Sequence, residues 1–346
     1  MTSSNSFKAE NFVIKKEDVA QFLKGLSDYT IYAPVQEEDA VLFKVIQTSD
    51  KIALQFTNSV KSPKHVVLPQ TETMLKVTKG KENNINIDEP NLDEKNILFG
   101  IRPCDSRGIA ILDKVFSGDY EDPYYVKRRA NTIMIGLACT DPHRNCFCTS
   151  VGGAPDATEG LDMLWTDIGD TYYIDVLTEK GMELIKGTVI FSKATNENTK
   201  AKNQAHKAAK EKITEKLNAE ALPKKLESLF EDEYWDNVSM KCLGCGSCTY
   251  LCPTCYCFDI NDIEYRDKVK RVRTWDSCQF SSYTIHTSGH NPRPNKENRM
   301  RNRIYHKYKY HYDNYNVLGC VGCGRCITYC PVDMNIKATI RELTKK

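Results

Sequence analysis

Eight of the fifteen cysteines in this 346-residue chain fall into two runs of identical spacing. The first run, KCLGCGSCTYLCP, covers residues 241–253, and the second, GCVGCGRCITYCP, covers residues 319–331. Each has the pattern C-x2-C-x2-C-x3-C-P, which is the thiolate spacing that holds [4Fe–4S] cubanes in bacterial proteins. The glycines between the cysteines let the backbone bend closely around the sulfurs and point N–H groups at them. The two runs therefore predict two [4Fe–4S] clusters.

In paired runs of this kind, which are typical of bacterial ferredoxins, the fourth cysteine of each run ligates the cluster of the other run. We therefore assign cluster I to Cys242, Cys245, Cys248 and Cys330. Cluster II is assigned to Cys320, Cys323, Cys326 and Cys252. Pro253 and Pro331 end the local helix after each run and set the direction of the following chain.

Three other kinds of cysteine site fit the runs less well. A structural zinc ion needs four ligands in two C-x2-C pairs, and each run would leave two further cysteines unused. A disulfide framework belongs to small secreted chains. Cys248, Cys252 and Cys255 also have the C-x3-C-x2-C spacing of radical-SAM enzymes, but that motif opens a barrel of roughly 200 residues or more. The chain after Cys255 is too short for such a barrel.

Seven cysteines lie outside the two assigned sets: Cys104, Cys139, Cys146, Cys148, Cys255, Cys257 and Cys278. The first four follow apolar strand-like segments, in FGIRPCD and IGLACTDPHRNCFCTSVGG. Loops at strand ends are where a scaffold presents ligands, so these four predict a third [4Fe–4S] cluster, with Asp105 as an alternative ligand. The competing interpretation is that they are small buried hydrophobic residues.

The last three cysteines occur in CPTCYCFD and TWDSC, close to the cluster runs. Two roles stay open for Cys255, Cys257 and Cys278. They either line the clusters or complete a site together with the N-terminal cysteines.

The element pattern predicts an α+β protein of two domains. Residues 1–230 alternate strands and helices, as in the apolar segments 97–101 and 132–137 and the helical segment 105–116, which predicts a mixed α/β domain. Residues 231–346 are expected to form a mainly helical, dicluster ferredoxin-like domain with a long insertion between its two runs. Further elements are expected as a disordered start over 1–10, helices over 15–26, 195–218 and 222–234, strands over 29–34, 40–47 and 51–56, a helix or strand over 71–77, and a hairpin over 163–167 and 171–176.

The insertion between the runs is rich in basic and aromatic residues, namely Arg271, Arg273, Arg299, Arg301, Arg303, Tyr305, Tyr308 and Tyr310. Such interleaving can bind nucleic acid or dock an acidic partner protein. We expect the more common arrangement, which is a solvated face over a packed aromatic stripe.

Several classes of function are disfavoured by what the chain lacks. Its net charge of +2 argues against nucleic acid as a partner of the whole chain. The N-terminal segment has no apolar signal region and no apolar run approaches 18 residues, so we expect a cytoplasmic protein that does not span a membrane. The chain contains neither G-x-G-x-x-G nor G-x4-G-K-[ST], so we expect no flavin or NAD in this chain. The chain also has no set of His, Cys or Asp residues at catalytic spacing. The pattern therefore indicates a protein that transfers electrons between partners.

Five segments together resemble one protein family: LFGIRPCDSRGIAILDKVF, GLACTDPHRNCFCTSVGG, CPTCYCFD, WDSCQF and GCVGCGRCI. They resemble the iron–sulfur (beta) subunit of cytoplasmic sulfhydrogenases and the related A subunit of anaerobic sulfite reductase, from about residue 12 to the C-terminus. LPQTETMLKV and the hairpin WTDIGDTYYIDVLTEKG look closer to the sulfhydrogenase branch.

The resemblance implies a partner subunit that binds FAD and NAD(P)H, and a terminal redox subunit. That terminal subunit could be a NiFe hydrogenase, a siroheme sulfite reductase or a heterodisulfide-reductase-type assembly. Two other classes stay open, namely an enzyme that acts at a cluster with an open iron, and a cluster-bearing regulator that binds nucleic acid through the basic insertion.

Overall fold

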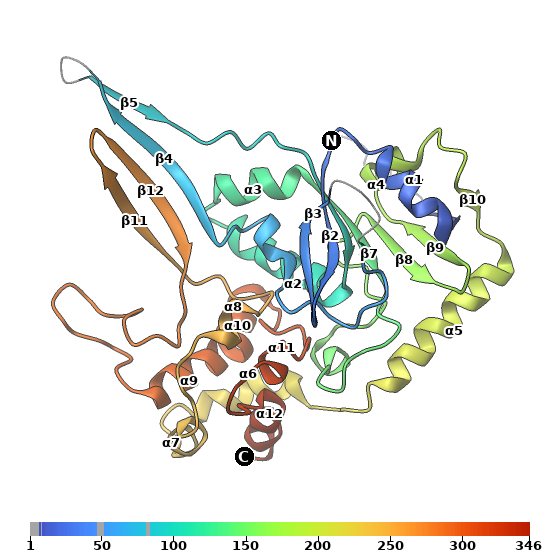
Figure 1. The fold of residues 1–346 in the computed structure, drawn as a ribbon. Coiled ribbons are helices and arrows are strands. Elements are labelled where there is room, and N and C mark those ends of the chain that lie inside the picture. The colour runs from blue at the N-terminus through green and yellow to red at the C-terminus, as the bar shows by residue number, and fades with distance from the viewer. Residues whose placement is uncertain (1–6, 8, 47–51, 81–83) are drawn as a thin grey trace, which may run out of the picture.

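The computed structural model describes residue 7 and residues 9–46, 52–80 and 84–346 (Figure 1). Most of the segment 1–10, where disorder was expected, lies outside this description. So do position 47 of the strand expected over 40–47 and position 51 of the strand expected over 51–56. The α+β fold class is confirmed, with strands and helices alternating in the N-terminal half and helices dominating the cysteine-rich half.

The larger sheet has eight strands in the order β10-β1-β9-β8-β7-β6-β2-β3. Its four central strands β8, β7, β6 and β2 run parallel to one another, and the outer strands pair antiparallel. Both β6 and β7 are buried along their whole length, which is the reason that they appear in the sequence as continuous apolar runs. The strands are β1 (Glu10–Lys15), β2 (Thr30–Glu37), β3 (Ala40–Val45), β6 (Asn96–Ile101), β7 (Thr132–Leu137), β8 (Met163–Asp167), β9 (Thr171–Val176) and β10 (Ser192–Lys193).

Helices cover both faces of this sheet. Successive residues of β6 point to opposite faces, so Phe99 belongs to one hydrophobic core and Leu98 to the other. The Phe99 side is covered by α1 (Val19–Lys24), which follows the short 3-10 turn Lys16–Asp18, and by α4 (Glu179–Ile185). The Leu98 side is covered by α2 (Pro103–Phe116), α3 (Pro123–Ala130) and the 3-10 turn η3 (Pro63–Val66).

Helix α5 (Asn196–Lys212) leads from the sheet to the cysteine-rich half (Figure 1). Thr195 begins it with a capping box in which the Thr195 and Asn198 side chains bind each other's backbone N–H groups. The helix expected over 222–234 is instead split into α6 (Leu222–Lys225), a 3-10 turn (Leu226–Ser228) and α7 (Tyr234–Ser239). Tyr305 Oη and Trp235 Nε1 donate to the carbonyls of Leu226 and Leu229, both at 2.7 Å, and so take acceptors that a continuous helix would use.

The cysteine-rich half packs around its own core. Trp235, Tyr305, Tyr308 and Ile340 are almost fully buried in it. Its helices are α8 (Ser247–Tyr250), α9 (Lys296–Tyr305), the π-helical turn η8 (His306–Tyr310), α10 (His311–Tyr315), α11 (Arg325–Thr328) and α12 (Ile336–Lys345).

A second sheet, in the order β11-β12-β4-β5, was not foreseen in the insertion. Strands β11 (Phe258–Tyr265) and β12 (Lys268–Trp275) form a hairpin, and β12 pairs antiparallel with β4 (Thr71–Lys79), which itself pairs with β5 (Ile85–Asp88). The two hairpins project together from the body of the molecule (Figure 1). This sheet joins segments from both sides of the boundary predicted near residue 230. It also shows that the segment 71–77 is a strand, whereas Ile52 forms only an isolated bridge to Val35.

Within the part of the chain that the structure describes, no helix is both long and apolar enough to cross a lipid bilayer.

Candidate iron–sulfur sites

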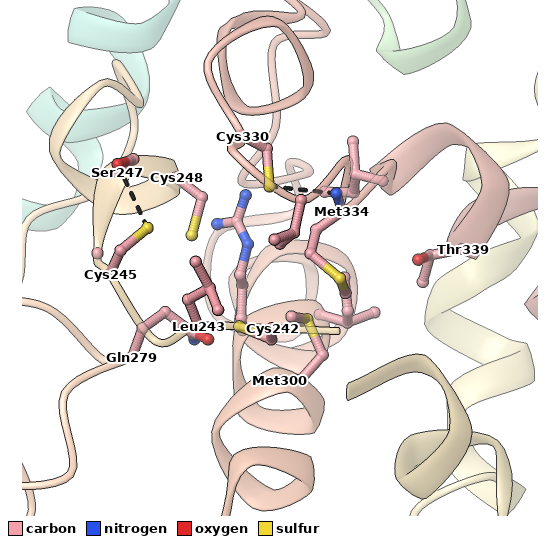
Figure 2. Close-up of a pocket in the computed structure, with 15 residues that line it drawn as sticks. Cys242, Leu243, Cys245, Ser247, Cys248, Gln279, Met300, Cys330, Met334 and Thr339 are labelled. Carbon is pink, nitrogen blue, oxygen red and sulfur yellow. Dashed lines mark hydrogen bonds between the residues drawn. The ribbon is translucent and has the colours of Figure 1, made fainter. Parts of the chain in front are cut away.

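The first cavity brings together the four cysteines assigned to cluster I, namely Cys242, Cys245, Cys248 and Cys330 (Figure 2). Its remaining wall is largely apolar and includes Leu243, Met300 and Met334. Backbone N–H groups point at the sulfurs: Gly244 donates to Cys242 Sγ at 3.4 Å and Met334 to Cys330 Sγ at 3.1 Å. Such N–H···S bonds are among the means by which proteins tune a cluster.

The second cavity brings together the four cysteines assigned to cluster II, which are Cys252, Cys320, Cys323 and Cys326. The chain returns to it from α8 through Cys252, as the exchange of the fourth ligand between the runs predicts. Lys307 Nζ lies at 3.2 Å from Cys252 Sγ and also donates to Thr254 Oγ1 at 3.0 Å and to the Gly319 carbonyl at 2.9 Å.

The third cavity brings together the four N-terminal cysteines Cys104, Cys139, Cys146 and Cys148. Cys104 lies in the first turn of α2, directly after β6, and Cys139 follows β7. Because the carboxyl ends of neighbouring parallel strands meet at the same edge of a sheet, these two thiols come together. Gly322 and Cys323 of the second run close the other side of this cavity.

Burial suppresses ionisation of most of these thiols. It raises the pKa of Cys146 and Cys148 to about 12 and that of Cys323 to about 11, with neighbouring thiols adding to the effect at Cys146. Cys245 and Cys252 are exceptions: hydrogen bonds from Ser247 lower the pKa of Cys245, and the contact with Cys255 lowers that of Cys252. Thiolates in such surroundings need nearby positive charge, which iron or a basic side chain supplies.

Buried cations lie beside the cavities. Arg303 is 5% exposed, lines both the first and the second cavity, and has no hydrogen-bond partner for its Nη1 atom among the described residues. Arg102 is 4% exposed, lines the third cavity, and among the described residues donates only to the backbone carbonyls of Phe56, Leu137 and Ala138.

Within the described residues neither arginine forms a carboxylate ion pair, and burying an unpaired charge is costly. A cubane with four thiolate ligands carries net negative charge, so these residues fit such a group. The described residues place no three His, Cys, Asp or Glu side chains close enough together to bind a single metal ion.

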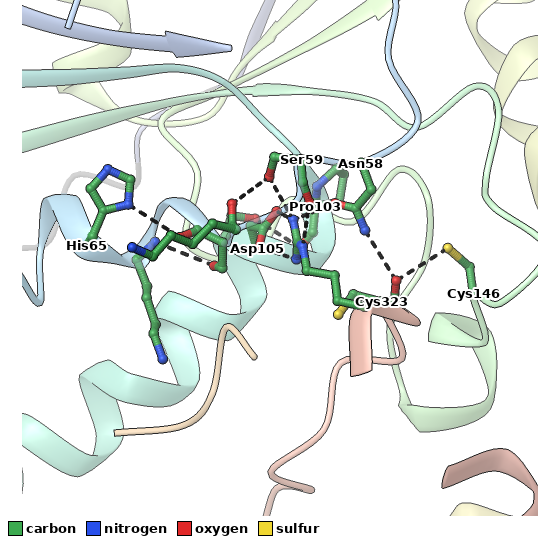
Figure 3. A network of polar contacts seen from close by, with 12 residues as sticks. Asn58, Ser59, His65, Pro103, Asp105, Cys146 and Cys323 are labelled. Atoms are coloured by element: carbon green, nitrogen blue, oxygen red, sulfur yellow. Dashed lines mark hydrogen bonds and ion pairs between the residues drawn. The ribbon is translucent and has the colours of Figure 1, made fainter. Parts of the chain in front are cut away.

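A buried polar network joins the second run to the N-terminal half (Figure 3). Arg325 donates from Nη1 and Nη2 to the two Asp105 oxygens, each at 2.7 Å, and both side chains are almost completely buried. Its other donors reach Asn58 and Ser59, and Asn58 Nδ2 donates to the Cys323 carbonyl at 3.2 Å. The sequence predicts Asp105 as an alternative cluster ligand, but Arg325 engages both of its carboxylate oxygens.

The three remaining cysteines lie elsewhere. None of Cys255, Cys257 and Cys278 belongs to the described lining of the third cavity, so the geometry does not support a joint site with the N-terminal cysteines. They gather at the base of the β11–β12 hairpin, where Cys255 contacts Cys252 of the cluster II set.

The basic insertion is only partly solvated. Arg271 and Tyr310 are exposed and Tyr308 is packed, as expected, but Arg273, Arg299 and Arg303 are buried. Arg273 pairs with Glu72 at 2.5 Å and also with Asp122, which ties β12 to the N-terminal half. Arg273 was expected on a solvated face because its buried partners, Glu72 and Asp122, are distant in the chain. Composition alone could not identify Arg303 or Arg102 as cavity residues.

Comparison with known proteins agrees with this geometry. Residues 241–334 match the family model of a 4Fe-4S dicluster domain, a range that contains both cysteine runs. The chain is 33% identical over 303 residues to sulfhydrogenase 2 subunit beta of Pyrococcus furiosus, which covers 87% of this chain and 88% of that protein. No solved structure matches the chain significantly. The expected pair of [4Fe–4S] clusters is thereby confirmed, whereas their ligands and the third cluster stay predictions.

Proposed function

The chain belongs to the sulfhydrogenase beta-subunit family, and on this premise we propose that it relays electrons between two partner subunits. One partner binds FAD and NAD(P)H, and the other is a terminal redox subunit. Electrons pass through the clusters of cavities one and two and through a third cluster at Cys104, Cys139, Cys146 and Cys148.

The observation that carries this proposal is that the three thiol-lined cavities adjoin in series. The first and second share Arg303 and Ile336 in their walls, and the second and third share Gly322 and Cys323. Redox groups held in adjoining cavities can exchange electrons without a moving carrier. The order is therefore cluster I, cluster II, cluster III, with cluster II in the middle.

The chain's own residues have three tasks in this relay. The thiolates hold the iron, which when bound supplies one-electron redox chemistry. Apolar walls such as Leu243 and Met300 limit water, and backbone N–H groups hydrogen bond the sulfurs. Arg303 and Lys307 place positive charge beside the thiolates and so favour the more negative, reduced state of the clusters they face.

The partners follow from the family and from the missing nucleotide motifs. We infer that a separate subunit supplies FAD and the NAD(P)H site. A NiFe hydrogenase is the terminal subunit that suits the sulfhydrogenase family, in preference to a siroheme sulfite reductase or a heterodisulfide-reductase-type module. We expect the complex in the cytoplasm, without nucleic acid or membrane as a partner.

The test replaces one ligand in the reconstituted complex with its flavin partner. Cys245→Ser should slow NAD(P)H-driven reduction of the downstream clusters by at least about tenfold and still allow the subunits to assemble, because Cys245 lies on an exposed loop. Cys255→Ser, outside the assigned ligand sets, is the matched control. Wild-type rates in the Cys245→Ser complex would refute the relay through cluster I. Anaerobic iron analysis adds a second measure, since three clusters require about 12 iron atoms per chain and two require about 8.

A further inference from the structure

Cys257 and Cys278 form a contact pair outside the three thiol cavities. The Cys257 side chain lies close enough to those of Cys278 and Tyr283 for each to influence its protonation. Neither cysteine is needed by the ligand sets assigned to the clusters. Two neighbouring thiols at the base of a β-hairpin can form a disulfide.

The hairpin itself creates this contact. Phe258 is paired with Trp275 at the base of β11 and β12, which places Cys257 and Cys278 just beyond the two strand ends. The Asp276 N–H donates to the Cys257 carbonyl at 2.9 Å and closes the base.

The loop that carries Cys278 is anchored on both sides. Ser277 Oγ lies at 2.8 Å from Thr249 Oγ1 in the first run. The Gln279 side chain donates to the Arg299 carbonyl at 3.1 Å and to Cys278 Sγ at 3.5 Å. The positions of the two sulfurs are thus set by buried contacts and not by a free loop.

A buried lysine supplies positive charge beside the pair. Lys64 is 2% exposed, donates to the carbonyls of Cys252 and Cys255, and packs its ammonium 4.2 Å from the centre of the Trp275 ring. No carboxylate of the described residues lies within ion-pair distance of it. Hydrogen bonds from Cys278 and Tyr283, and the charge of Lys64, lower the pKa of Cys257 to about 6 despite burial, so this thiol can ionise.

The pair lies next to the electron path. The charge of Cys278 is among the influences that, after burial, raise the pKa of Cys248 in the cluster I set to about 11. On the other side, Cys255 contacts Cys252 in the cluster II set. The pair therefore adjoins the thiol groups of the first two cavities.

We propose that Cys257 and Cys278 are a redox-active pair that stores two electrons beside the clusters. In the oxidised chain the two sulfurs share a disulfide bond. Two electrons, delivered one at a time by the neighbouring clusters, break the S–S bond, and two protons from solvent give two thiols. Oxidation reverses the step, with both electrons returning to the clusters. The inference rests on the proposed relay for its physiological electron source but not for the chemistry of the pair.

The experiment uses the full chain with its clusters, poised anaerobically at a series of potentials with redox dyes and with dithionite as the reductant. Each sample is quenched in acid, alkylated with N-ethylmaleimide and analysed by peptide mass spectrometry. We expect a Cys257–Cys278 cross-link at high potential and two alkylated thiols at low potential. Reductive titration of wild type should consume two more electrons per chain than titration of Cys278→Ser, which is the stoichiometry of a disulfide.

Two further variants make the test decisive. Cys255→Ser should keep the cross-link, because Cys255 is not a member of the pair, and Cys257→Ser should lose it while keeping the wild-type iron content. Absence of the cross-link at every potential overturns the proposal, as does loss of about four iron atoms in Cys257→Ser, which would make Cys257 a cluster ligand. Dithionite reduces the chain without the flavin partner. A failure of NAD(P)H-driven reduction alone would therefore refute the proposed relay without refuting the redox activity of the Cys257–Cys278 pair.

Discussion

The two cysteine runs have the same local backbone and very different surroundings. Gly244 and Gly322, at equivalent positions, both have φ of +66°, and Gly246 and Gly324 have φ of +77° and +74°. Each run contains a four-residue helix, α8 in the first and α11 in the second. The repeated spacing therefore produces the same ligand loop twice.

The surroundings differ in solvent and in contacts. In the first run Cys245 is exposed, and Leu243 and Met240 beside it are 62% and 72% exposed. In the second run Cys320 is buried, and Phe147 N–H donates to the Gly322 carbonyl at 2.8 Å. The first run therefore lines the cavity at the surface end of the series. The second run lines the middle cavity.

This difference shows how one motif can hold clusters at two different positions along an electron-transfer path. Burial, N–H···S bonds and nearby charge set the potential of a cluster of given ligation. We infer that cluster I is the terminal that a partner reaches and that cluster II is the protected intermediate. Three predictions test the contrast between the two runs, beginning with the largest expected effect.

Arg325→Met should destabilise the protein by about 3–5 kcal/mol, because it leaves Asp105 as an uncompensated buried carboxylate. Ser247 is the equivalent residue of the first run, and Ser247→Ala should cost less than about 1 kcal/mol. Anaerobic urea titration of both variants measures the difference. Equal and small losses in the two variants would show that the second run does not depend on its contact with the N-terminal half.

Gly322→Ala should cost roughly 2–4 kcal/mol, from the left-handed backbone and from overpacking together. A Cβ atom there would stand 2.5 Å from the Cys148 nitrogen, and backbone atoms cannot move away easily. Gly244→Ala has the same φ, but its nearest neighbour is the Gln279 carbonyl oxygen at 3.3 Å, so we expect a smaller loss of about 1–2 kcal/mol.

Thermal unfolding of the Gly322→Ala and Gly244→Ala proteins, each with its clusters bound, measures which substitution costs more stability. A larger loss for Gly244→Ala than for Gly322→Ala would contradict the packing difference between the runs.

Removal of iron by a water-soluble chelator should be several-fold faster for cluster I than for cluster II, because Cys245 is exposed and Cys320 and Cys252 are buried. EPR of the reduced protein during the reaction distinguishes the two signals, and Cys245→Ser identifies the one that belongs to cluster I. Simultaneous loss of both signals would argue that the two sites open together.

The sequence predicted the elements whose patterns are local. The hairpin 163–167 and 171–176 was confirmed as β8 and β9. The bounds of the buried strand β6 and of helix α2 lie within one or two residues of the predicted ranges 97–101 and 105–116. The β11–β12 hairpin was missed because β11 is exposed along almost its whole length and its alternation of apolar and polar residues changes phase between Asn261 and Asp262. Strand β4 stayed ambiguous until its pairing with β12 decided it.

The cluster-binding cysteines could be predicted from the sequence because the spacing of ligands within one loop is a local property of the covalent chain. The number of clustered cysteines, their grouping into runs and the expected exchange of the fourth ligand all follow from it. What surrounds each run depends on contacts between residues far apart, such as Arg325 and Asp105, which are 220 positions apart. Folding therefore determined which run is buried, that the N-terminal cysteines adjoin the second run, and that Arg303 lies between the first two cavities. Packing of distant segments creates these environments, and no short stretch of sequence contains them.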